Sequence, residues 1–161
     1  MSTYMQIKGI NGSATDKDHQ GWIPLLGKSF QVSVDVKSSV GHNSSRQMGA
    51  LSMGEFSITK ISDESSAKLL QQVIESTNIP EVIVDVCLAG DGKKVSDRYT
   101  LKDVVISHFE EASSQDVQSG SVEFLVLNFR NIEVRHTPYT QAGQSKTPYS
   151  VSYDLNAAAS A

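Results

Sequence analysis

Apolar and polar residues alternate with a period of two through most of this chain, and one segment with a helical period interrupts the alternation. The clearest run is FQVSVDVK at 30–37, where every second residue is apolar, and the runs at 55–60 and 149–155 repeat it. Successive side chains of a strand point to opposite faces, so each run predicts a strand with one apolar and one polar face. The run at 122–129 is apolar on both faces and predicts a strand that crosses the middle of the core. The chain is therefore predicted to be mainly β.

The interruption predicts a single short α-helix over about 63–77. Its apolar residues follow the three-and-four spacing that places side chains on one face, and we expect this face to pack onto the sheets: Ala67, Leu70, Val73 and Ile74. Ser62 is the predicted N-cap, with Asp63 and Glu64 in the first turn, where they complement the positive end of the helix dipole. Pro80 prevents the helix from continuing.

Length and charge limit the classes of protein to which the chain can belong. Its 161 residues fit one domain, predicted over 1–155 with a frayed tail at 156–161. The net charge of -4, without a long run of like charge, argues against nucleic acid as a partner. No apolar run is long enough to insert into a membrane and no signal peptide is recognisable, so a cytosolic fold is expected. The single Cys87 lies in an apolar run and is predicted to be a small core residue.

No pattern in the sequence predicts a catalytic, cofactor or metal site. The segment 16–21 begins like a calcium loop, but Gly27 stands where the twelfth-position Glu is required, so a polar turn is expected. The four histidines lack the spacing of a zinc site, and no serine lies in a Gly-x-Ser-x-Gly turn. We predict that the protein is not an enzyme. The enzymatic alternative is a hydrolase that uses His42 or His108 with a nearby Asp.

The longest stretch without a pattern is 38–52, which predicts a long loop. Loops of this length in compact domains are disordered or functional. Its glycines Gly41 and Gly49 allow bends, whereas Val40, Met48 and Leu51 are apolar residues that a disordered segment has little reason to carry. These apolar residues either pack back onto their own domain or contact another molecule.

Three stretches together resemble the Hcp family, the haemolysin co-regulated proteins that form the inner tube of type VI secretion systems. The segments 5–13 and 16–23 are similar to the family's opening strand, turn and second strand, although the Glu of the family's Gly-Glu-Ser turn is absent. The segment 54–60, followed by 63–66 and 69–70, resembles the family's strand-to-helix junction. The segment 99–107 resembles its Leu-x-x-Val-x-Ile-Ser strand. Their order and spacing make the match specific and indicate a divergent member.

The resemblance implies a small β-barrel of two packed antiparallel sheets with one helix, assembled as hexameric rings that stack into a tube. Such a tube is expelled from the cell with contraction of a sheath and carries small effectors in its lumen. The expected partners are other copies of the chain, the spike, sheath and baseplate proteins, and effectors. The protein would be cytoplasmic before firing and then secreted, without a signal peptide, to the medium or to a target cell.

The resemblance also implies a role for the long segment as an arm that contacts a neighbouring subunit or the next ring. The residues expected to make this contact are Val40, Gly41, His42, Arg46, Gln47, Met48, Gly49 and Leu51. Two other β architectures remain open. One is a monomeric barrel that binds a small apolar ligand, which requires large gaps in the core. The other is a relative of phage tail-tube proteins.

Overall fold

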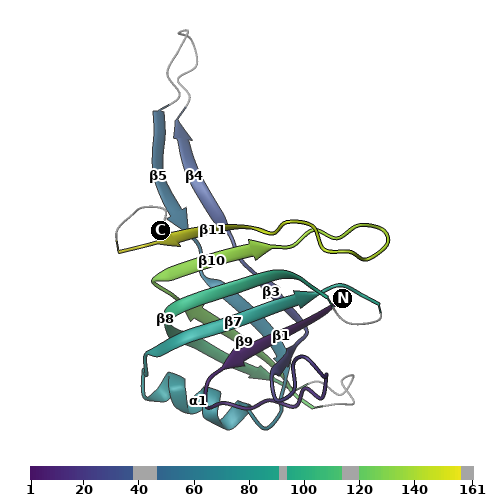
Figure 1. The fold of residues 1–161 in the computed structure, drawn as a ribbon. Coiled ribbons are helices and arrows are strands. Elements are labelled where there is room, and N and C mark those ends of the chain that lie inside the picture. Colours follow the sequence, from purple (N-terminus) through teal and green to yellow (C-terminus); the bar gives the residue numbers. More distant parts are fainter. Residues whose placement is uncertain (38–46, 91–93, 114–119, 157–161) are drawn as a thin grey trace.

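The computed structural model describes residues 1–37, 47–90, 94–113 and 120–156, and these form antiparallel β-sheets with one short helix (Figure 1). The elements in chain order are β1 (Ser2–Ile7), β2 (Ile23–Leu25), β3 (Gly27–Ser29), β4 (Val32–Lys37), β5 (Gln47–Met53), β6 (Phe56–Ile61), α1 (Ser66–Ile74), β7 (Ile79–Cys87), β8 (Val95–Ala112), β9 (Val122–Asn128), β10 (Asn131–His136) and β11 (Tyr149–Asp154). The predicted mainly β class with one helix is confirmed.

The long strand β8 belongs to both sheets of the body. Its first half, up to Val104, pairs with β7, and its second half, from Val105, pairs with β9. Asp103 lies at this change of partner with a φ of 51°, in the left-handed region that Asp tolerates better than most residues. On the first half of β8, β10 pairs along the edge opposite β7. One sheet therefore runs β2-β1-β7-β8-β10-β11 and the other β8-β9-β6-β3.

The two sheets are joined a second time by the segment 23–29. Its β2 pairs with β1 in the first sheet, and its β3 pairs with β6 in the second. Between them, the backbone N–H of Leu26 donates to the carbonyl of Thr59 at 2.7 Å, so the pairing with β6 begins before β3 does. Because the sheets meet both at β8 and at this segment, they enclose one core, as in the small barrel that the resemblance implies.

Side chains from both sheets fill the space between them. The buried cluster includes Met5 from β1, Ile58 from β6, Leu101 from β8 and Leu125 from β9, each at most 1 % exposed. On β6 the predicted alternation is confirmed by burial, which changes at every residue. On β9, which was predicted to be apolar on both faces, burial also changes at every residue. The strand β9 lies between β8 and β6, which confirms its predicted central position. Its other face, however, is partly open, and Phe124 is 37 % exposed.

Helix α1 lies across the lower end of the body in Figure 1, and three predictions about it were wrong. It begins after Ser65 rather than Ser62, and no acidic residue lies in its first turn. The residue that it buries completely is Leu69, with Val73 partly buried, whereas Leu70 and Ile74 of the predicted packing face are exposed. The helical spacing identified the period correctly but not the buried face. Leu69 is four residues and Leu70 three residues before Val73, so either leucine could share a helix face with Val73.

The predicted loop at 38–52 was wrong for its second part, because Gln47–Met53 forms β5, which pairs antiparallel with β4. The predicted buried face of 30–37 is also not buried within the protomer: Val32, Val34 and Val36 are exposed. The exposure of the valines has a physical reason. The two strands pair with each other as a separate two-stranded sheet and project from the body, so their apolar residues have no core of their own to enter.

Candidate assembly surface

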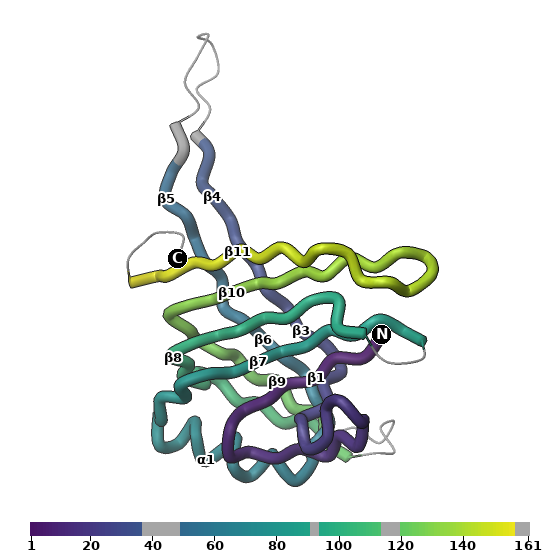
Figure 2. Tube along the Cα trace, viewed as in Figure 1, coloured from purple at the N-terminus to yellow at the C-terminus, as the bar shows by residue number. Residues whose placement is uncertain are grey.

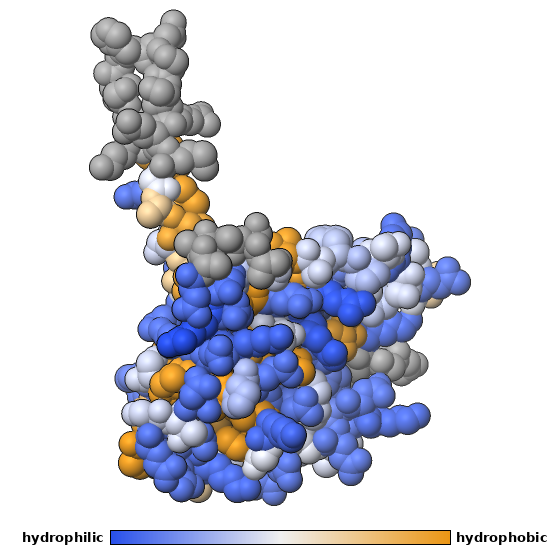
Figure 3. All heavy atoms as spheres, turned by 60° about the vertical axis from the view of Figure 1, so that its left-hand side comes forward, coloured by the Kyte–Doolittle hydropathy of each residue, from blue (hydrophilic) through white to orange (hydrophobic). Residues whose placement is uncertain are grey.

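The hairpin of β4 and β5, called the arm below, stands away from the two body sheets in both ribbon and tube views (Figures 1 and 2). Its valines Val32, Val34 and Val36 are 46 %, 38 % and 53 % exposed, and Leu51 opposite Val34 is 39 % exposed. Figure 3 shows hydrophobic surface along the described part of the arm. A contiguous apolar surface of this kind marks an interaction site in a soluble protein.

The residues expected to make the arm's contacts fall into two groups. Val40, Gly41, His42 and Arg46 lie outside the described residues. Gln47, Met48, Gly49 and Leu51 lie on β5, where a register irregularity between Val34 and Val36 accommodates an extra residue. Gly49 is needed for this close approach, because a Cβ there would lie 2.8 Å from the Asp35 carbonyl oxygen. Four of the expected contact residues therefore lie together on one extended strand of the arm.

Aromatic packing and one tight backbone contact fix the base of the arm to the body. The ring of Phe30 lies 6.0 Å from that of Phe56 and 6.1 Å from that of Phe129, between ring centroids. The N–H of Gly54 donates to the Gln31 carbonyl at 2.8 Å, and a Cβ at Gly54 would lie 2.6 Å from that oxygen. The direction in which the arm leaves the body is therefore set by core residues.

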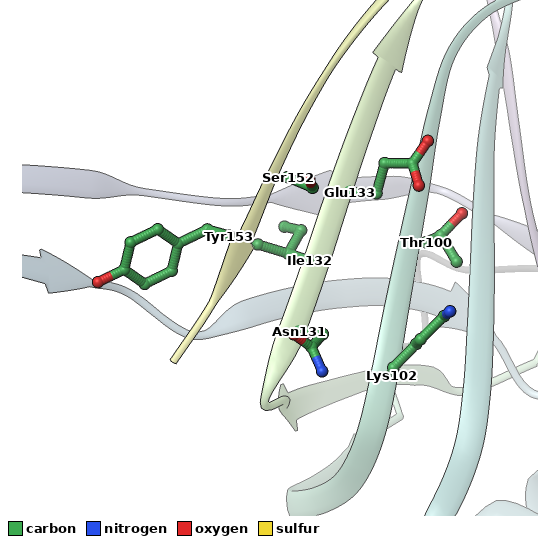
Figure 4. Close-up of a pocket in the computed structure, with 7 residues that line it drawn as sticks. All are labelled: Thr100, Lys102, Asn131, Ile132, Glu133, Ser152 and Tyr153. Atoms are coloured by element: carbon green, nitrogen blue, oxygen red, sulfur yellow. The ribbon is translucent and has the colours of Figure 1, made fainter. Parts of the chain in front are cut away.

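A second open surface lies on β11, which pairs only with β10 among the described strands. The apolar side chains of Tyr149 and Val151 are 63 % and 67 % exposed. Next to them is a cavity of about 230 Å³ on β8, β10 and β11, lined by Thr100, Lys102, Asn131, Ile132, Glu133, Ser152 and Tyr153. In Figure 4, Thr100, Lys102 and Glu133 stand on one side of the strands, with Ile132 and Tyr153 on the other. The edge therefore offers backbone groups and apolar side chains to another molecule.

A buried ion-pair network links β6, β9 and the segment before α1. The Lys60 ammonium is fully buried and lies 2.8 Å from the Glu123 carboxylate and 3.0 Å from that of Asp63. It also donates to the Ser66 hydroxyl at 3.1 Å. Burial alone raises the pKa of Asp63, but hydrogen bonds from Ser65 and the Lys60 ammonium outweigh it, so the pKa is lowered overall. The network holds the start of the helix on the sheet.

A second network lies on the outer side of the first sheet, under the segment that connects β1 to β2. The fully buried Asp85 carboxylate accepts hydrogen bonds from Nε and Nη2 of Arg98, both at 2.7 Å. Its Oδ2 is also 2.9 Å from Nε2 of His19, whose ring stacks on Tyr4. The hydrogen bond to Asp85 raises the pKa of the Arg98 guanidinium above its ordinary value. This geometry fixes the connecting segment on the first sheet.

The other predicted side chains have plain structural positions. Cys87 is fully buried, which confirms its predicted place in the core. Asp16 and Asp18 lie in a turn, where the Asp18 N–H donates to the Asp16 side chain at 3.2 Å, as the polar-turn prediction expected. His108 is exposed on β8 with Nε2 3.3 Å from the Glu110 carboxylate. The alternative hydrolase residue His42 lies outside the described residues.

In the described ranges, no three or more His, Cys, Asp or Glu side chains are grouped to hold a metal ion. The only described helix, α1, is too short to cross a membrane.

The two ion-pair networks were missed by the sequence analysis. The alternation contained a signal for one of them: Lys60 follows Phe56 and Ile58 on their apolar face, and Glu123 precedes Leu125 and Leu127 on the facing strand. No comparable signal links His19 to Asp85, because His19 lies in the segment between β1 and β2 and not on an alternating strand.

Comparison with known families identifies the fold and the family. A family model described as "Type VI secretion system effector, Hcp" matches residues 4–136. The chain belongs to the Hcp family. A solved structure described as a type six secretion system protein shares 19 % identity and a TM-score of 0.93, with 99 % of each chain covered. Hcp1 and Hcp2 from Salmonella typhimurium share 19 % and 21 % identity, with TM-scores of 0.76 and 0.71. For Hcp1 the match covers 99 % of this chain and 98 % of that one, and for Hcp2 98 % of both.

At these identities the solved structures support the fold, and the family match supports the function. No curated protein matches the chain. As an Hcp protein, the chain is a secreted tube protein of a type VI secretion system. A subunit of a tube contacts other subunits, so the exposed apolar side chains of the arm and of β11 are candidates for these contacts.

Proposed function

We propose that this Hcp protein forms hexameric rings that stack into the inner tube of a type VI secretion system. The observation that carries the proposal is the apolar arm, with Val32, Val34, Val36 and Leu51 exposed on a hairpin that pairs with none of the described strands of the body. Burying such side chains against another subunit is favourable by about 1.5–3 kcal/mol for each that is fully buried. A closed ring of identical contacts satisfies every subunit equally, and stacking extends the rings into a filament.

The proposed tube is expelled by sheath contraction and carries small effectors within its lumen. The spike ahead of it, the sheath around it and the baseplate below it are the partners that this mechanism requires. The protein is then cytoplasmic before firing and outside the producing cell afterwards. The outer face of the first sheet, with Lys102 and Glu133 exposed, is compatible with a hydrated surface along the path of a carried protein.

We assign the arm the role of contacting the adjacent subunit or ring. The tested variant is Val34→Asp, which places a charge on the apolar face of β4. Its matched control is Ser33→Asp, which introduces the same charge one residue away on the opposite face of the same strand. Thermal melting reports the fold of each variant, sizing by light scattering reports assembly, and a secretion assay reports function.

Val34→Asp should retain the melting temperature of the isolated protomer, reduce ring formation or stacking, and reduce secretion, whereas Ser33→Asp should behave like the wild type. Deletion of 41–49 should likewise spare the fold while weakening stacking and abolishing secretion. If both the substitution and the deletion assemble and are secreted normally, the arm is a surface element and this assignment is wrong.

A further inference from the structure

Four strands of the first sheet place one row of side chains on its outer face. The register aligns Asp85 of β7 with Arg98 of β8, Arg98 with Arg135 of β10, and Arg135 with Ser150 of β11. Residues directly opposite each other in antiparallel strands project to the same face, about 4.5–5.5 Å apart at Cβ. The row therefore contains two neighbouring arginines and one carboxylate.

The single carboxylate of the row, Asp85, is already hydrogen-bonded to other side chains. Both oxygens of Asp85 accept hydrogen bonds from Arg98, and one of them also contacts His19. The Asp85 side chain is fully buried, so it cannot turn toward Arg135. This bidentate pair neutralises Arg98, whereas the row contains no second carboxylate to neutralise Arg135.

Arg135 forms no ion pair within 4.0 Å with any carboxylate of the described chain. Glu133 is two residues away on the same face of β10, but it borders the neighbouring cavity with Lys102. Like charges directly opposite each other on paired strands are destabilising. Because Asp85 is engaged by Arg98 and the described residues place no carboxylate within 4.0 Å of Arg135, an added anion would stabilise the Arg135 charge.

A cavity of about 180 Å³ lies at this pair, lined by Val95, Arg98, Arg135, Thr137 and Tyr139. The Tyr139 hydroxyl donates to the Val95 carbonyl at 2.9 Å, which fixes that wall of the cavity. The Thr137 N–H donates to the Ser96 carbonyl at 2.7 Å, so the backbone beside the threonine hydroxyl is held in place. The cavity thus combines two guanidinium groups, a hydroxyl and an apolar wall.

We propose that the cavity between Arg98 and Arg135 binds a carboxylate on an acidic segment of a partner protein. The planar guanidinium matches a carboxylate through two parallel hydrogen bonds, which makes such pairs strong and directional. The inference deepens the proposed function, since a protein carried by the tube is the partner that it assigns. Because the chain as a whole is negatively charged, with a net charge of -4, general attraction does not favour an acidic segment, and local contacts must supply the binding.

The experiment measures binding of a fluorescent glutamate-rich peptide by anisotropy, with the corresponding glutamine peptide as the probe control. The variant is Arg135→Gln, and the matched control is Arg130→Gln, which removes the same charge from an exposed arginine before β10. Light scattering and thermal melting are recorded for each protein. Inorganic phosphate is added as a competitor to compare a free oxyanion with a peptide carboxylate.

Arg135→Gln should weaken binding of the glutamate peptide by about tenfold or more, the effect of one lost charge-assisted pair. Arg130→Gln should change it less than about threefold, as expected for a distant charge in salt. The assembled mass and the melting temperature should be the same in both variants. This combination supports a carboxylate site at Arg135.

Three results would overturn the inference: no binding by the wild type, equal weakening by both variants, or tighter binding of free phosphate than of the peptide. A fourth is loss of assembly in Arg135→Gln alone, which would assign the guanidinium to a contact between copies. Failure of the proposed function is a separate result. A wild-type protein that stays monomeric would contradict the ring, while the peptide comparison would still decide the site.

Discussion

Replacement of Lys60 by methionine should destabilise the protein more than any other single loss of charge in the described body. The change keeps an unbranched side chain of similar length but removes the ammonium that lies 2.8 Å from Glu123 and 3.0 Å from Asp63. Glu123 is 1 % exposed, so its carboxylate would remain buried without a cation. Removing one partner of a buried pair typically lowers the free energy of unfolding by about 3–5 kcal/mol.

For a domain of this length, 1 kcal/mol corresponds to about 2–4 °C in the melting temperature, so we expect a fall of about 6–20 °C. The measurement is urea unfolding followed by circular dichroism, together with thermal melting. Lys17→Met is the matched control, since Lys17 is an exposed lysine in the turn before β2, and its loss should change the free energy by less than about 0.5 kcal/mol.

The double variant Lys60→Met with Glu123→Leu tests the physical reason directly. Removing both charges leaves no buried carboxylate on β9, so the double variant should be more stable than Lys60→Met alone. If Lys60→Met unfolds within about 1 kcal/mol of the wild type, or if the second substitution lowers stability further, the argument from the buried pair is refuted.

Three further substitutions test separate parts of the structure. Asp63→Asn should lower stability most at neutral pH, because the folded-state pKa of Asp63 lies below its ordinary 3.8; the difference from wild type should shrink as the pH falls below that value, and a constant difference would contradict this. Cys87→Ser places a hydroxyl in the core, so the free energy of unfolding should fall by about 1–3 kcal/mol while assembly and secretion persist; loss of secretion by a folded assembly would show a functional thiol. Gly54→Ala forces a Cβ to within 2.6 Å of the Gln31 carbonyl oxygen, so it should reorient the arm and impair assembly at a loss of about 1–3 kcal/mol; unchanged assembly and melting would show that the base adapts.

The β character of the fold was predictable from the sequence because the period of two in β6 directly reflects burial at every second residue. The helix illustrates the limit of such patterns. Leu69 and Leu70 are adjacent apolar residues, and only the placement of α1 against the sheets decides that Leu69 is buried. Tertiary packing selects the face, whereas the sequence supplies only the spacing.

The arm shows a different limit. The valines of β4 were correctly read as one face of a strand, but period alone does not say whether that face meets its own core or another molecule. The absence of a period in 47–53 hid β5, because a register irregularity there shifts the alternation. The network of His19, Asp85 and Arg98 was beyond sequence reasoning, since it depends on the long segment between β1 and β2 folding over the sheet.

The most direct test of the account is the mass of the purified protein by light scattering, coupled to negative-stain images of the particles. A hexameric ring should appear as ring-shaped particles with a solvent-filled central hole and a mass of about 105 kDa, six times the 17.5 kDa of one chain, or multiples of it where rings stack. A sharp 17.5 kDa monomer at micromolar concentration, without ring particles, would contradict the proposed tube assembly.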